Sequence, residues 1–292
     1  MTVCASGCYS ATSGREVSIR SFILENYLEQ TSELKTDAKV IMMHLTFSAS
    51  GFMAIYQLGA AVALHRHGSR LLSKIQNYAG ASGGALVAAV LLAQPETLEQ
   101  CKEFTFEFAA DVRRQMFGAI TPGYDFMKLL REGINSILKA DAHEEAHGRL
   151  HVSVTNAKTL QNSLISSFPT RDDLMTVLLA SSFVPLYSGI KAVKYNGESW
   201  IDGGLTNRLP ILSDGRTLTV SPFSGRLDIC PQDSDQNNFY ISIAKQDFIF
   251  SVANFVRLSH ALFPPSRERM EFLYHKGFDD AMMFLQNKNC FQ

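Results

Sequence analysis

The sequence predicts an α/β fold with three layers, in which a mostly parallel central sheet carries helices on both faces. Two observations support this prediction. Apolar runs of strand length alternate with helical patterns from residue 40 onward, which is typical of parallel strands joined by crossover helices. The first run, residues 40–47, is almost continuously apolar, as expected for a strand that is buried on both faces.

Local signals set the elements of the first half of the chain. A loop of small residues follows the first strand and leads into a helix expected over residues 54–67, which Gly68 ends. A second strand is expected over residues 75–79, followed by a turn and an apolar helix over residues 85–93. Apolar side chains then recur at helical spacing from Leu98 to Val112, which indicates one buried helix face.

The second half continues the alternation. Residues 170–173 (TRDD) form a capping-box pattern that opens a helix over residues 174–182. Two further helices are separated by Pro264 and Pro265. The expected strands are residues 151–155, 163–168, 199–202, 217–221 and 239–243. Because no internal repeat or low-complexity linker interrupts this pattern, we expect one domain over residues 40–292.

Composition narrows the classes of function. Hydrophobic residues make up 46% of the 292 residues, enough for a sizeable core, and the formal net charge is −1. No basic stripe recurs, so we expect no nucleic-acid partner. The five scattered cysteines lack Cys-x-x-Cys spacing, which favours a reducing, intracellular compartment and argues against a disulfide framework. We predict no metal site and no cofactor.

Membrane association is expected to be peripheral, because no apolar run approaches the ~20 residues that span a bilayer. Residues 1–39 are rich in Ser, Thr, Cys and Gly at their start and show little periodicity, so we expect a poorly ordered leader. Two alternatives are a mitochondrial transit peptide, against which Glu16 and the sparse arginines argue, and acylation at Cys4 and Cys8.

The segment Gly80-Ala81-Ser82-Gly83-Gly84 fits the nucleophile-elbow pattern G-x-S-x-G. A sharp turn from strand to helix exposes a serine hydroxyl, and glycines on either side let the strand and helix approach closely. The positive end of the following helix favours a developing oxyanion. We therefore predict that Ser82 is a nucleophile; the alternative is an ordinary glycine turn.

A serine nucleophile also needs a base and amide donors for the oxyanion. Asp202-Gly203-Gly204 ends a predicted strand and is the candidate base motif, although an aspartate there also suits a type I turn. The loop Ser48-Ala49-Ser50-Gly51-Phe52 lies between a strand and a helix and is the candidate source of amides. His260 and His275 are alternative bases in a Ser-His-Asp triad, but each falls within a predicted helix.

Together these residues resemble the patatin-like phospholipase family. The resemblance covers residues 42–292 and includes the elbow, the Asp202 triplet and four longer stretches. These stretches are residues 120–127 (ITPGYDFM), 180–185 (ASSFVP), 221–229 (SPFSGRLDI) and 261–266 (ALFPPS). It implies a patatin-like three-layer fold and a Ser82–Asp202 dyad without a histidine. It also implies hydrolysis of triacylglycerol and other neutral acylglycerols, with retinyl ester hydrolysis and acyl transfer as related reactions, and contact with a lipid droplet or membrane surface.

One departure from the family concerns the oxyanion loop. The family pattern is G-x-G-x-x-G, whereas Ala49-Ser50-Gly51-Phe52-Met53-Ala54 keeps the middle glycine alone. If position 49 or 54 has a positive φ, alanine there costs about 1 kcal/mol and misdirects a donor. A weakly active or non-catalytic lipid-surface binding protein therefore remains an alternative function, and a histidine-dependent α/β-hydrolase is another.

An acylglycerol is nearly insoluble, so its enzyme must meet it at a lipid surface or receive it through an apolar channel. With a near-neutral chain, this contact should depend on apolar side chains around the site. We expect at least two of Phe52, Met53, Phe183 and Leu186 to border the site and form an exposed apolar patch.

Overall fold

The computed structural model describes residues 42–233 and 239–288. The expected leader, with Cys4 and Cys8, lies outside the described residues. Within them, Cys101 and Cys230 are buried free thiols, no group of three or more potential metal ligands is found, and no helix is long and apolar enough to cross a membrane.

The predicted mixed α/β architecture is confirmed. A seven-stranded sheet has the order β5-β6-β3-β2-β1-β7, with β4 paired to β3. Its parallel centre consists of β1 (Met43–Phe47), β2 (Ile75–Ala81), β3 (Leu150–Asn156) and β7 (Arg216–Val220). The antiparallel strands are β4 (Asn162–Ile165), β5 (Val193–Tyr195) and β6 (Glu198–Asp202). A separate hairpin pairs β8 (Tyr240–Ile243) with β9 (Gln246–Ile249).

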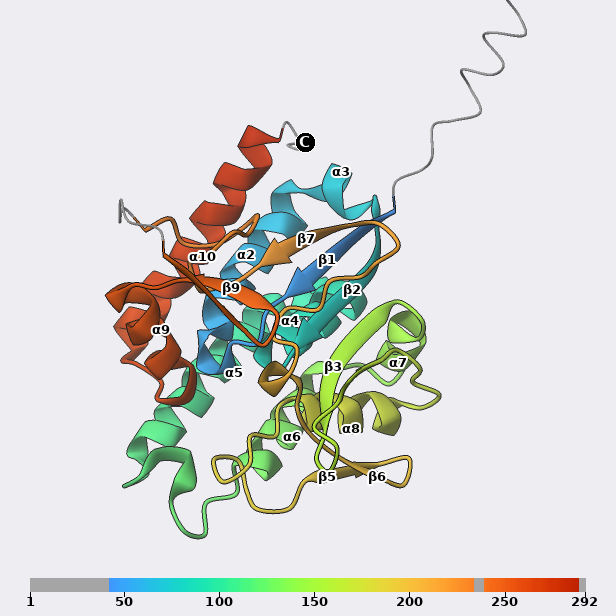
Figure 1. The fold of residues 1–292 in the computed structure, drawn as a ribbon, viewed down its shortest axis with the longest axis vertical. Coiled ribbons are helices and arrows are strands. Elements are labelled where there is room, and N and C mark those ends of the chain that lie inside the picture. Colours follow the sequence, from blue (N-terminus) through green and yellow to red (C-terminus); the bar gives the residue numbers. More distant parts are fainter. Residues whose placement is uncertain (1–41, 234–238, 289–292) are drawn as a thin grey trace, which may run out of the picture. The chain divides into compact units, whose positions relative to one another are not determined.

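Helices surround the sheet (Figure 1). They are α2 (Ala54–His67), α3 (Ser69–Leu72), α4 (Gly83–Ala93), α5 (Leu98–Arg114), α6 (Phe126–Ile137), α7 (Ala142–Ala146), α8 (Arg171–Ser181), α9 (Val252–Leu262) and α10 (Arg267–Asn287). The predicted bounds of α2 match the structure, and so does the capping box of α8, in which Thr170 and Asp173 each accept the other's amide. The sequence did not predict β5, β9, α3, α6 and α7.

The pairing of α2 with α10 anchors the segment that enters the predicted site. The two helices cross so closely that a Cβ added at Gly59 would lie 1.9 Å from the Tyr274 carbonyl oxygen. A Cβ at Gly277 would lie equally close to the Tyr56 carbonyl oxygen. The Tyr56 hydroxyl donates to the buried Asp280 carboxylate at 2.7 Å, so α2 is fixed both by backbone contact and by a buried polar pair.

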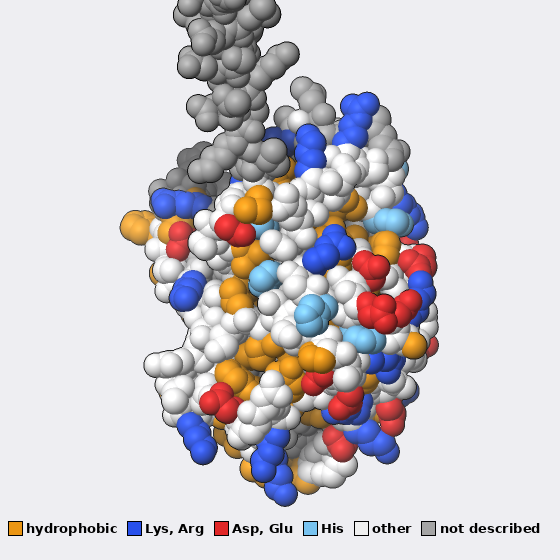
Figure 2. Space-filling model, turned by 90° about the vertical axis from the view of Figure 1, so that its right-hand side faces the viewer, with side chains coloured by type: hydrophobic (Ala, Val, Ile, Leu, Met, Phe, Trp, Pro, Cys, Tyr) orange, Lys and Arg blue, Asp and Glu red, His pale blue; other side chains and the backbone are white. Residues whose placement is uncertain are grey.

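Charged side chains on the face drawn in Figure 2 are intermingled: Lys and Arg alternate with Asp and Glu, and no continuous basic stripe is present. This distribution agrees with the near-zero net charge of −1.

Candidate active site

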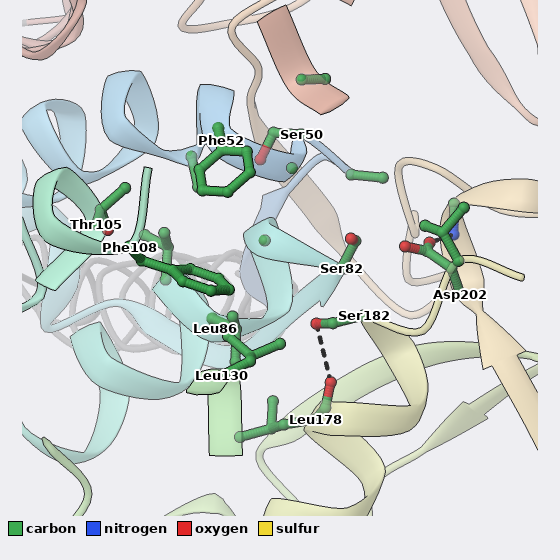
Figure 3. Close-up of a pocket in the computed structure, with 18 of the residues that line it drawn as sticks. Ser50, Phe52, Ser82, Leu86, Thr105, Phe108, Leu130, Leu178, Ser182 and Asp202 are labelled. Atoms are coloured by element: carbon green, nitrogen blue, oxygen red, sulfur yellow. Dashed lines mark hydrogen bonds between the residues drawn. The ribbon is translucent and has the colours of Figure 1, made fainter. Parts of the chain in front are cut away.

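An apolar cavity of about 400 Å³ lies among α4, α5, α6 and α8, and most of its polar groups gather at one end. Figure 3 shows Ser50, Ser82, Ser182 and Asp202 toward one side of this space, with phenylalanine and leucine side chains toward the other. The apolar wall includes Leu86, Val90, Phe104, Phe108, Phe126, Leu130, Ile134, Ile137 and Leu178. Such a cavity with convergent polar groups is the usual form of a small-molecule site.

Ser82 is held in a strained conformation at the junction of β2 and α4. Strand β2 ends at Ala81 and helix α4 begins at Gly83, and Ser82 between them has φ 53° and ψ −131°. A serine in the positive-φ region carries a conformational cost that the surrounding structure must offset. The Ser82 amide donates to Ser181 Oγ at 2.8 Å, and Ser181 Oγ donates to the Ser153 carbonyl at 2.7 Å.

The elbow glycines have a steric role. A Cβ added at Gly80 would lie 2.6 Å from the Ala85 nitrogen, within the turn itself. A Cβ added at Gly84 would lie 2.3 Å from the Ser48 carbonyl oxygen, on the neighbouring loop. Any side chain at either position would push α4 away from the sheet, so the turn requires glycine at both.

The 49–54 loop lies directly against this turn. Its short helix η1 (Gly51–Met53) begins at Gly51, which has φ 51° and whose added Cβ would meet the Ala261 carbonyl oxygen at 2.1 Å. Within the described residues, the amides of Ser50, Gly51 and Phe52 have no protein hydrogen-bond partner, whereas Met53 donates to Ser50. Free amides here, with that of Gly83 at the start of α4, are suited to an oxyanion.

The two family glycines replaced by alanine do not strain the loop. Ala54 has φ −53°, and Ala49 is not among the residues with positive φ. The Ala49 amide is bonded to the Arg208 carbonyl at 2.7 Å and is not an oxyanion donor. The condition under which alanine would misdirect a donor is therefore not met at either position.

Asp202 lies at the end of β6, where several backbone contacts fix it. Its amide donates to the Phe183 carbonyl at 2.8 Å, and its carbonyl accepts the Thr155 hydroxyl at 2.8 Å. The carboxylate accepts the Gly204 amide at 2.6 Å. The residue is 4% exposed, and its side chain faces Ser82 (Figure 3).

Burial raises the pKa of Asp202 from its ordinary 3.8 to about 6. The Ser82 hydroxyl, the Gly204 amide and the Arg208 guanidinium each lower this pKa, but their combined effect is smaller than that of burial. A carboxylate with such a pKa is ionised at neutral pH and basic enough for general-base catalysis. No hydrogen bond is drawn between Ser82 and Asp202 in Figure 3. Their catalytic roles therefore stay a prediction.

No histidine lies on the wall of this cavity in the described part of the chain. His260 is on α9 and half-buried, and His275 is exposed on α10. The geometry thus supports the dyad over the histidine triad.

Sequence reasoning missed three residues that shape the site. Arg208 lines the cavity, and Ser181 holds the elbow amide. Gln57 accepts the Ser50 hydroxyl and donates to the Ser48 carbonyl, which ties the 49–54 loop to α2. Arg208 follows the Asp202 triplet closely in the chain, which is a weak signal. Ser181 is 99 residues from Ser82, so their contact cannot be seen in the sequence. Gln57 is seven residues from Ser50, but a single glutamine within a predicted helix does not indicate that contact.

The predicted apolar patch is wrong for three of its four residues. Phe52, Met53 and Phe183 are 6%, 1% and 2% exposed, and Leu186 alone is exposed, at 79%. Of the four, Phe52 alone lines the cavity, where its ring packs against Phe108 and Phe126. Phe52 is core because α5, which the sequence predicted, and α6, which it did not, enclose its ring.

The chain is similar in sequence to several known proteins. The family described as "Patatin-like phospholipase" matches residues 45–213. The chain is 60% identical to human patatin-like phospholipase domain-containing protein 4 over 250 residues, covering 86% of this chain and 99% of that protein. It is 35% identical to human patatin-like phospholipase domain-containing protein 2 over 83% of this chain and 48% of that protein. Human omega-hydroxyceramide transacylase is 33% identical over 84% of this chain and 46% of that protein.

Because burial in the folded protein disfavours the ionised form of Asp202, the Asp202→Asn substitution should stabilise the folded protein. The folded state binds the Asp202 proton more tightly than the unfolded chain does. Ionisation of Asp202 therefore lowers the free energy of unfolding as the pH rises from 3.8 to about 6. At pH 8 the free energy of unfolding should rise by about 3 kcal/mol, and the gain should vanish below pH 4. Urea unfolding at both pH values measures it, with the exposed Asp279→Asn as control; a destabilised Asp202→Asn at pH 8 would contradict it.

Proposed function

The chain belongs to the patatin-like phospholipase family, and we propose that it is a serine acyl-hydrolase that acts on neutral lipid esters. The observation that carries this proposal is the strained Ser82, which faces the buried Asp202 at the polar end of an apolar cavity. Triacylglycerol is the substrate that we expect, with retinyl esters as a related class.

In the proposed mechanism, Asp202 accepts the proton of the Ser82 hydroxyl while the Ser82 oxygen attacks the ester carbonyl carbon. The resulting oxyanion receives hydrogen bonds from amides at Gly51, Phe52 and Gly83. When the carbon–oxygen ester bond breaks, the leaving alkoxide takes the proton from Asp202 and departs as an alcohol. Water then attacks the acyl-enzyme and releases the acid; an alcohol in its place gives acyl transfer.

The shape of the cavity supports an acyl chain as the bound group. Its wall follows α4 from Ser82 through Leu86 to Val90, a length of roughly 12 Å for eight residues at the helical rise. Apolar side chains from α5 and α6 complete this wall. An extended hydrocarbon chain would replace no hydrogen bonds there, and its transfer from water is favourable.

We further propose that the protein contacts a lipid surface through an apolar platform that consists of Phe250, Val252, Phe255 and Phe263. These side chains are 56%, 79%, 54% and 61% exposed, and their residues lie within α9 or within two residues of its ends. Figure 1 shows where α9 lies. On the same helix, Leu258 and Leu262 are partly exposed and also line the cavity. The platform therefore runs into the cavity wall, as a path for an insoluble substrate requires.

Charge contributes little to this contact. The arginine of α9, Arg257, is bound to the Asp233 carboxylate at 2.7 Å and is 15% exposed. Its positive charge is therefore already paired and adds little attraction for anionic headgroups. The platform is thus suited to the uncharged surface of a neutral lipid.

Ser82→Ala should reduce hydrolysis of long-chain acylglycerols and retinyl esters by at least about 10³-fold, because no other cavity group replaces the nucleophile. Hydrolysis of a lipid panel, with released fatty acid quantified, measures this effect. Ser182→Ala is the matched control, since Ser182 also lines the cavity but its hydroxyl is bonded to the Leu178 carbonyl. Equal activity of wild type and Ser82→Ala would leave a lipid-binding protein as the better function.

Flotation with triacylglycerol droplets tests the platform. Phe255→Ser combined with Phe263→Ser should lower the bound fraction several-fold, because both exposed rings lose apolar area that the lipid would bury. Met283→Ser, an equally exposed apolar site near the far end of α10, should float like wild type. Binding that disappears as salt rises would show that charge controls the contact and would overturn the apolar account.

A further inference from the structure

Arg208 touches the 49–54 loop with both its backbone and its side chain. The Arg208 carbonyl accepts the Ala49 amide at 2.7 Å. A guanidinium nitrogen of the same residue donates to the Ala49 carbonyl at 3.0 Å. Ala49 is thus held on both of its backbone polar groups by one residue, immediately before the amides proposed to bind the oxyanion.

The guanidinium is placed where a charge is hard to accommodate. It packs over the rings of Phe223 and Phe248, each 5.5 Å from the guanidinium carbon. It forms no ion pair among the described residues, and its buried Nε has no hydrogen-bond partner there. A side chain held only for packing would not need a charge at this position, because an apolar residue avoids the desolvation penalty.

The group that benefits from this charge is Asp202. Arg208 and Asp202 both line the polar end of the cavity, and each stabilises the charged form of the other. The other groups that meet Asp202 are neutral: the Ser82 hydroxyl facing it, the Gly204 amide of η4 (Gly203–Leu205), the Phe183 carbonyl that follows α8 and the Thr155 hydroxyl of β3. Among the described residues, Arg208 is therefore the one charged side chain that acts on Asp202.

We propose that Arg208 is a positioning residue that couples the two halves of the site, fixing the oxyanion loop at Ala49 and keeping Asp202 ionised. The assignment rests on the proposed Ser82–Asp202 dyad. It gives two separable roles to one side chain. One guanidinium nitrogen holds the loop through its hydrogen bond to the Ala49 carbonyl, and the positive charge acts through space on the carboxylate.

The sign of the electrostatic role follows from the chemistry of an acid. A nearby cation favours the carboxylate and lowers its pKa, so removal of the cation raises it. At a given pH near neutrality, less Asp202 is then ionised and less can accept the Ser82 proton. The acidic limb of the kcat/KM profile should consequently move to higher pH when the charge is removed.

Three variants separate the two roles. Arg208→Met removes both charge and fork, and Arg208→Lys keeps the charge alone. Arg149→Met removes a cation at the start of β3, at the opposite end of the strands from Ser82. In Arg208→Met the acidic limb should move up by about one pH unit and kcat should fall. Arg208→Lys should keep the limb but lose kcat, and Arg149→Met should match wild type in both.

A second readout does not depend on activity. The carbon-13 resonance of the Asp202 carboxyl, assigned by comparison with Asp202→Asn, reports its titration directly. The Asp202 pKa should be higher in Arg208→Met than in wild type and Arg208→Lys. An unchanged titration in Arg208→Met overturns the coupling, whether or not the protein hydrolyses lipids. Absence of Ser82-dependent hydrolysis in wild type, with the titration shifted as expected, would instead reject the proposed function.

Discussion

The strained turn at Ser82 is the constraint on which the rest of the site depends. Its positive φ of 53° persists because β2 and α4 meet with no side chain between them at Gly80 and Gly84. Gly84 also rests against the Ser48 carbonyl, so the elbow and the 49–54 loop cannot move independently. The close crossing of α2 and α10 fixes that loop from behind. A local conformational cost is thus offset by packing across the domain, as is common where a nucleophile must be exposed.

The second unfavourable feature is a carboxylate placed away from water. Burial alone would raise the pKa of Asp202 further, and the neighbouring groups bring that pKa down to about 6. Those groups also have structural duties: Gly204 continues the turn after Asp202, and Arg208 holds Ala49. The site therefore gives up stability at neutral pH for a carboxylate that is both ionised and basic. Such a balance is more easily explained by proton transfer than by passive lipid binding.

Features encoded locally were predictable from the sequence. The bounds of α2, the capping box at Thr170 and the elbow around Ser82 depend on neighbours in the chain, so their residues carry the signal. Other features depend on partners far away. Phe52 is enclosed by Phe108 of α5 and Phe126 of α6, which come from other parts of the chain. Arg208 meets Ala49, and nothing nearby in sequence shows that contact. The apolar platform was missed because apolar spacing does not reveal which face of α9 lacks a partner.

Covalent labelling with a fluorophosphonate tests the central claim most directly, because this probe reacts with activated serines whatever the natural substrate is. Mass spectrometry of the digested adduct should place the label on Ser82. The labelling rate should fall by at least about 10²-fold in Asp202→Asn, while Ser182→Ala labels like wild type. A label on another serine, or an Asp202→Asn variant that labels Ser82 as fast as wild type, would contradict a nucleophile activated by Asp202.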